Sequence, residues 1–106
     1  MGKSKVYFTK EISAQSLQKI YDTLVRESGI ELTGKVGVKV STGEAGSKGY
    51  LKDDLIAPLV KALNGTILEC NTAYPGKRNT AEEHMKVAKD HGFLDFAEVD
   101  IMDAEN

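Results

Sequence analysis

The sequence predicts an α/β fold built on a parallel sheet, and three observations support this class. Short segments rich in β-branched or aromatic residues alternate with segments whose apolar residues recur at helical spacing. Helical connections of this length join parallel strands with a right-handed crossover. The chain has 106 residues, of which 41% are hydrophobic and 28% are charged, enough for one folded core. We therefore expect a single domain over residues 1–106 with the order β-α-β-α-β-α-β.

The first part of the chain predicts a strand, a helix and a second strand. KVYFTK, residues 5–10, is short and aromatic-rich, as strands are. A helical face follows, with apolar residues at i, i+3, i+4, i+7 and i+8: Leu17, Ile20, Tyr21, Leu24 and Val25. Ser13 is suited to the N-cap of this helix and Gly29 to its C-terminal cap. KVGVKVS, residues 35–41, alternates valine with other residues and predicts the second strand.

The middle of the chain predicts a helix and a third strand. Apolar residues recur at helical spacing here: Leu51, Leu55, Ile56, Leu59, Val60 and Leu63. Pro58 would break a helix interior, so we expect the helix to begin near Asp53 or Asp54, which places the proline close to the first turn. The Asn64–Gly65 pair ends the helix, and GTILECN, residues 65–71, reads as the third strand.

The last part predicts a third helix and a fourth strand. Thr80 and Glu83 match the capping-box pattern T-x-x-E, so this helix should begin at Thr80. It should end at His91, with Gly92 as a left-handed cap. AEVDIM, residues 97–102, alternates apolar and acidic residues as a half-buried strand does.

The predicted architecture is a three-layer sandwich, flavodoxin-like or Rossmann-like, with a mainly parallel four-stranded sheet and helices on both faces. The order of the strands within the sheet cannot be read from these patterns.

Charge and composition exclude several classes of function. The formal net charge is −2, with cationic and anionic residues interspersed, so we expect no binding to nucleic acid or to an anionic membrane. A single cysteine excludes an internal disulfide. No apolar run is long enough to span a membrane, and MGKSKVYF lacks the apolar core of a signal peptide. We expect a soluble, cytoplasmic domain.

Two loops are expected at the carboxyl ends of the strands, where open parallel sheets bind ligands. STGEAGSKGYLK, residues 41–52, and NTAYPGKRN, residues 71–79, are rich in donor side chains and lead into helix N-termini, which favour anions. Lys39, Lys77 and Arg78 add positive charge, so the rim could hold a phosphate or a carboxylate. The alternative is that these are ordinary loops, since neither matches a G-x-G-x-x-G or P-loop pattern.

Three side chains at this rim, and His91 at the C-terminal end of the third helix, are candidates for a special role. Cys70 ends a strand and reads as a half-buried small hydrophobe, or as a thiol whose pKa is lowered by Arg78 and the helix start. His84 should face the loop, whereas His91 is explained by the negative end of the helix dipole. The two histidines lie too far apart to share a metal ion, and no zinc site or Ser-His-Asp triad is indicated. Glu44 is the one loop carboxylate that could act as an acid, a base or a metal ligand, and the alternative is that it is simply solvated, as most loop glutamates are.

The runs KVSTGE, YLK, NGTILECNTAY, GKRNTAEEH and KDHGF together closely resemble the N-terminal part of the domain-of-unknown-function 362 family, over nearly the whole chain. Members of that family are often described as ferredoxin-like or iron–sulfur cluster-binding. They are longer, and many carry a C-x₂-C-x₂-C-x₃-C-P segment towards the C-terminus, which is missing here. One departure is Pro75, where a small residue such as glycine is expected.

The resemblance implies that this chain is an N-terminal piece of a longer protein. It implies no cofactor in this chain, a 4Fe–4S cluster in the full-length protein, and the remainder of that protein as a partner. Together with Lys77, the loop residues that carry the predicted ligand site are Lys39, Ser41, Thr42, Gly43, Glu44, Cys70, Asn71, Thr72, Tyr74, Gly76, Arg78, Thr80 and His84. Three functions stay open: binding of a small anionic or polar ligand, docking without any activity, and thiol redox chemistry at Cys70.

Overall fold

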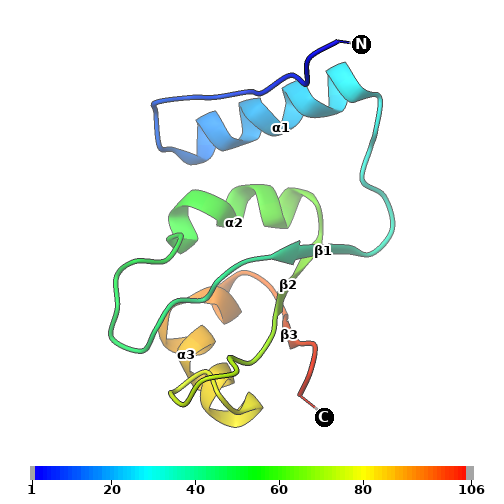
Figure 1. Cartoon of the computed structure of the whole chain (residues 1–106). Helices are drawn as coiled ribbons and strands as arrows, with labels where there is room; N and C mark the ends of the chain where they lie inside the picture. Colours follow the sequence, from blue (N-terminus) through cyan, green and yellow to red (C-terminus); the bar gives the residue numbers. More distant parts are fainter. Residues whose placement is uncertain (1, 105–106) are drawn as a thin grey trace.

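The protein is a mixed α/β domain in a computed structural model that describes residues 2–104 (Figure 1). Its elements, in chain order, are α1 (Ala14–Ser28), β1 (Val36–Lys39), α2 (Asp53–Ala62), β2 (Gly65–Glu69), α3 (Ala81–Asp90), the short 3₁₀ helix η1 (Phe93–Asp95) and β3 (Val99–Ile101). No helix in this part of the chain is both long and apolar enough to cross a membrane.

The three strands form one parallel sheet with the order β1-β2-β3. Val38 on β1 pairs with Ile67 on β2, which pairs in turn with Val99 on β3. The prediction of parallel strands joined by helices is thereby confirmed. Because the strands are parallel, their carboxyl ends lie at one edge of the sheet, and the loops that follow β1 and β2 leave from that edge.

The predicted strand at residues 5–10 is wrong. This segment forms no strand, and it runs extended beside α1 (Figure 1). Val6 and Phe8 are 86% and 80% exposed. A strand needs a neighbouring strand to complete its backbone hydrogen bonds, and the sheet in the described residues does not include this segment. The sheet accordingly has three strands there and not four.

One face of the sheet carries the hydrophobic core. Ile67 of β2 is fully buried in a cluster that includes Val60 of α2, Ala88 of α3 and Phe93 of η1. Both α2 and α3 therefore contribute to the core on the same side of the sheet. The opposite face presents Gly37, Leu68 and Asp100 among others, since side chains alternate along a strand. The expected helical layer on that second face is not seen among the described residues.

The helix boundaries follow the predicted capping residues. Ser13 caps α1 through its side chain, which accepts a hydrogen bond from the Ser16 backbone, and Gly29 ends that helix at φ 70°. Helix α2 begins at Asp53 as expected, although Pro58 lies beyond its first turn. Gly92 has φ 87° directly after α3, the left-handed conformation that glycine adopts without strain.

Thr80 is predicted to stabilise the helix that carries His84. Its side chain accepts a hydrogen bond from the Glu83 backbone N–H at 3.4 Å. Thr80→Ala removes this cap and should lower the free energy of unfolding by about 1 kcal/mol, whereas Thr80→Ser should retain most of it. Urea unfolding of the two variants measures the difference. Equal midpoints for the alanine and serine variants would show that the cap contributes nothing.

Candidate functional site

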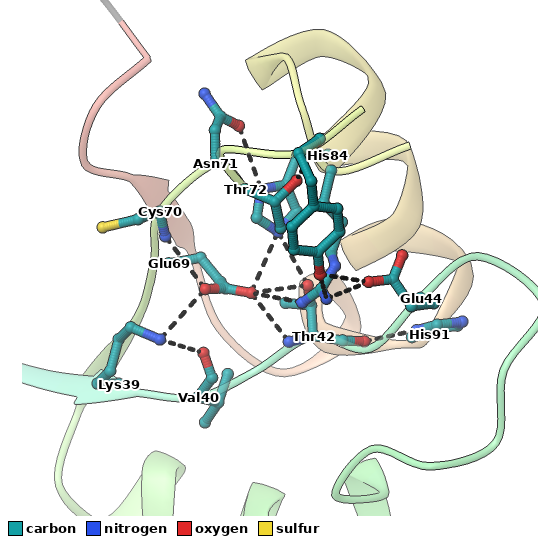
Figure 2. A network of polar contacts seen from close by, with 12 residues as sticks. Lys39, Val40, Thr42, Glu44, Glu69, Cys70, Asn71, Thr72, His84 and His91 are labelled. Atoms are coloured by element: carbon teal, nitrogen blue, oxygen red, sulfur yellow. Dashed lines mark hydrogen bonds and ion pairs between the residues drawn. The ribbon is translucent and has the colours of Figure 1, made fainter. Parts of the chain in front are cut away.

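The carboxylate of Glu69 is the centre of a buried polar cluster at the carboxyl edge of the sheet (Figure 2). Glu69 is the last residue of β2 and is only 3% exposed. It points to the same face as Ile67, two residues earlier, because side chains alternate along the strand. The pattern that buries Ile67 in the core therefore also brings a carboxylate into the protein, and such a group requires donors around it.

The donors come from three segments of the chain. The Glu69 Oε1 atom accepts from the Lys39 ammonium at 3.2 Å and from the Cys70 backbone N–H at 3.1 Å. Its Oε2 atom accepts from both the backbone N–H and the hydroxyl of Thr42, each at 3.0 Å. The Arg78 Nη1 atom lies 3.6 Å from the same oxygen. The end of β1 and the loops that follow β1 and β2 are thus joined through one side chain.

These contacts keep Glu69 ionised. Burial by itself acts to raise the pKa of the Glu69 carboxyl, because it disfavours the charged form. The hydrogen bonds from the two backbone N–H groups, from the Thr42 hydroxyl and from Lys39 outweigh burial and lower this pKa from 4.5 to about 2. The cluster therefore contains a carboxylate that stays negative at any pH near neutrality.

His84 connects α3 to this carboxylate and is fully buried. Its Nε2 atom lies 2.9 Å from the Thr42 hydroxyl and 3.2 Å from Glu69 Oε2, and its Nδ1 atom lies 3.2 Å from Asn71 Oδ1. The prediction that His84 faces the loop is confirmed by these contacts. Since every polar atom of the ring has a protein neighbour, His84 positions the loop residues and has no surface that a ligand could touch.

Arg78 extends from the buried cluster to the surface. Its side chain is 12% exposed, with Nη1 directed to Glu69 and Nη2 hydrogen-bonded to Glu44 Oε1. The Tyr74 hydroxyl donates to the same Glu44 oxygen at 2.8 Å. Hydrogen bonds from Arg78 and then Tyr74 lower the pKa of the Glu44 carboxyl below its ordinary value. Glu44 thereby ties the glycine-rich loop after β1 to the loop after β2.

A second set of contacts fixes the start of the glycine-rich loop. The His91 ring stacks on Tyr50, with centroids 3.9 Å apart, and its Nδ1 atom lies 2.6 Å from the Thr42 carbonyl oxygen. Gly43 has φ 86°, and a side-chain carbon there would come within 2.9 Å of Tyr50. His91 therefore orders this loop, a role that the helix-dipole explanation did not include.

The structure brings together seven of the predicted site residues and separates the others. Those in the cluster are Lys39, Thr42, Glu44, Asn71, Tyr74, Arg78 and His84. Ser41 is exposed, Thr80 caps α3, and Lys77 pairs with Glu83 at 3.7 Å. Thr72 contributes through its backbone, which donates to the Arg78 carbonyl oxygen at 2.7 Å.

Cys70 is exposed, so its predicted half-burial is wrong. Its sulfur points away from the Glu69 carboxylate, while its backbone N–H belongs to the cluster (Figure 2). The thiol and the polar cluster are therefore separate features of the rim.

Sequence reasoning missed Glu69 and Tyr50. A signal for Glu69 was available, since the alternation in GTILECN places it on the same face as Ile67. Nothing local marks Tyr50, because its partner His91 is distant in the sequence and meets it only after the chain folds.

The residues of this chain do not fit a 4Fe–4S cluster. Such clusters are held by four cysteine thiolates, and the sequence has one cysteine. Within residues 2–104, no group of three or more histidine, cysteine, aspartate and glutamate side chains is arranged to hold a metal ion. The cluster that the resemblance implies would require ligands from another part of a longer protein.

Comparison of the chain with protein-family models, curated proteins and solved structures gave no match. The resemblance to the domain-of-unknown-function 362 family therefore stays a prediction.

Proposed function

We propose that this domain binds a small anionic or polar ligand at the carboxyl edge of its sheet. The observation that carries the proposal is the placement of Arg78. Glu69 and the surrounding protein hold one end of its guanidinium, and the other end reaches the surface between the two loops. A fixed guanidinium needs little reordering when it binds an anion, which lowers the cost of binding.

The charges at the rim favour an anionic ligand once Glu44 is set aside. Around the Glu69 carboxylate, Lys39 and Arg78 contribute two positive charges against one negative charge, which leaves one positive charge in excess. The Asp103 carboxylate, which accepts from the Asn71 backbone N–H at 2.9 Å, adds a negative charge beside Asn71. Lys39 adds its charge from the other side of the Glu69 carboxylate, where its ammonium contacts Oε1 and its side chain is 54% exposed. The Tyr74 hydroxyl adds a neutral donor beside Arg78.

The wider setting that we propose follows the resemblance. The domain would belong to a longer, cytoplasmic, ferredoxin-like protein whose 4Fe–4S cluster is held by other residues. In that protein, further segments would cover the open face of the sheet and complete the flavodoxin-like or Rossmann-like sandwich with its fourth strand. No step of ligand binding at the rim depends on the cluster.

An amide-shift titration tests the proposal. The ¹⁵N-labelled domain is titrated with inorganic phosphate, nucleotides, flavin mononucleotide and small carboxylates to millimolar concentration. At least one should shift residues 41–50 and 71–80, and Arg78→Lys should weaken that binding, because lysine keeps the charge but loses the planar fork. If none of these probes shifts either loop, the proposal is wrong.

A second candidate function is docking on the remainder of a longer chain, with no activity of its own. The observation that favours it is a row of exposed apolar side chains near the N-terminus: Val6, Phe8 and Ile12 are 86%, 80% and 85% exposed. Large exposed apolar side chains commonly mark an interface where they form a patch. Hydrogen exchange of a longer gene product would distinguish the two functions. Docking through this row predicts that residues 6–12 become protected without any ligand, whereas ligand binding at the rim predicts that residues 41–50 and 71–80 become protected only when the ligand is added.

A further inference from the structure

We infer that the Glu44 carboxylate occupies the position where a ligand would bind. A carboxylate group of the ligand would displace Glu44 from Arg78 and Tyr74. This inference rests on the proposed function and deepens it, because it names the chemical group that the rim binds and the contact that competes with it. It concerns the outer end of the polar cluster, where the two loops meet.

The pairing of Glu44 with Arg78 is suited to exchange. The Glu44 side chain is 49% exposed, whereas that of Arg78 is 12% exposed and is held from behind by Glu69. Ion pairs with an exposed partner typically contribute little to stability, because water screens the attraction and the side chain loses freedom. Of the two partners, Glu44 is therefore the one that can leave while the other stays in place.

The backbone around Glu44 permits this movement. Gly43 and Gly46 flank it, with φ of 86° and 77°, and such residues can change conformation without a side-chain penalty. Gly46 has no neighbouring atom within 4 Å of the position where a side chain would begin, so there is open space at this position of the turn. The Ser47 backbone N–H donates to the Glu44 carbonyl oxygen at 2.9 Å, a bond that can stay in place while the Glu44 side chain moves. A shift of residues 44–46 would free Arg78 and leave the Thr42 contacts of Glu69 intact.

One hydrogen-bond donor of the Arg78 guanidinium is unsatisfied in the present arrangement. Its Nε–H is buried and has no hydrogen-bond acceptor among the described residues. Nε and Nη2 lie along the same edge of the guanidinium, and a carboxylate can engage this edge through two parallel hydrogen bonds. Glu44 contacts Nη2 through one oxygen only. A ligand carboxylate that approached after Glu44 had moved could satisfy both donors, which is an advantage that Glu44 lacks.

These observations favour a carboxylate over a phosphate. The group already in place is a carboxylate, and the open edge of Arg78 matches its planar pair of oxygens. Departure of Glu44 leaves one positive charge in excess among Lys39, Arg78 and Glu69, and the Asp103 carboxylate beside Asn71 further disfavours a dianion.

The test compares Glu44→Gln, Glu44→Ala and a charge-matched control, Glu98→Gln, at the opposite edge of the sheet. Acetate and inorganic phosphate are titrated at constant ionic strength, while the Arg78 Nε–H resonance and the amides of residues 43–47 are followed. Both Glu44 variants should bind acetate about two- to fivefold tighter than the wild type, since an exposed ion pair contributes up to about 1 kcal/mol. The Glu98 variant should bind as the wild type does.

The possible results separate the inference from the proposed function. Acetate binding that is unchanged by both Glu44 substitutions, or that leaves the Arg78 Nε–H resonance unmoved, would overturn the displacement of Glu44 only. Phosphate binding at the loops without acetate binding would overturn the choice of carboxylate. Failure of both probes and of the wider ligand panel to shift the loops would overturn the proposed function as well.

Discussion

Glu69→Gln is expected to lower the free energy of unfolding by about 3 kcal/mol, because removing one partner of a buried charged cluster leaves the other charges uncompensated. The substitution preserves the size of the side chain but removes the charge that balances Arg78 and Lys39. It also replaces one of the two accepting carboxylate oxygens by an NH₂ donor, which would then face the donors of either Thr42 or Cys70. Urea unfolding followed by circular dichroism measures the change.

Glu98→Gln is the matched control, because it makes the same chemical change at an exposed side chain. It should alter the free energy of unfolding by less than about 0.5 kcal/mol, as most surface substitutions do. If Glu69→Gln is as mild as this control, the carboxylate is not the centre of the cluster.

The stability of the protein should fall between pH 4.5 and pH 2 because of Glu69. The pKa of this carboxyl is about 2 in the folded protein, against an ordinary value of 4.5 that applies when the chain is unfolded. A lowered folded-state pKa stabilises the protein fully above the unfolded-state value, and this contribution is lost as the pH falls towards the folded-state value. The full contribution is about 3 kcal/mol, since each pKa unit corresponds to about 1.4 kcal/mol.

The pH dependence is measured by urea unfolding at a series of pH values, with the wild type and Glu69→Gln compared throughout. The difference in stability between them should shrink steadily below pH 4.5, because glutamine does not titrate. A constant difference between the two proteins across this range would mean that the carboxyl of Glu69 has an ordinary pKa.

The regular elements were largely predictable because their signals are local. Ser13, Thr80 and Gly92 determine where helices begin and end through contacts within a few residues. The valine alternation in residues 35–41 likewise reflects burial of one face of a strand. The prediction of a strand at residues 5–10 was wrong because strand formation is not a local property. The composition of this segment suits a strand, but a strand also needs a partner strand, which the local sequence does not specify.

The location of the candidate site in the fold was predictable, but the contacts among its side chains were not. The carboxyl edge of a parallel sheet is a general location for ligands, so the two loops could be singled out from the sequence. The central role of Glu69 depends on contacts with Thr42 and Arg78, which come from different loops. The sequence singled out the loop carboxylate Glu44 and not the strand carboxylate Glu69, since a charged residue is rarely fully buried unless it is paired, and the partners of Glu69 are distant in the sequence.

The most direct test of this account is the ionisation of the Glu69 carboxyl, measured by ¹³C NMR of the side-chain carbon as the folded protein is acidified. We predict that its resonance stays at the ionised position through pH 4 and begins to titrate only as the pH approaches 2. That result would establish that the Glu69 carboxylate stays ionised although it is buried. A midpoint near the ordinary value of 4.5 would contradict the account, because the donors around Glu69 would then not be stabilising its negative charge.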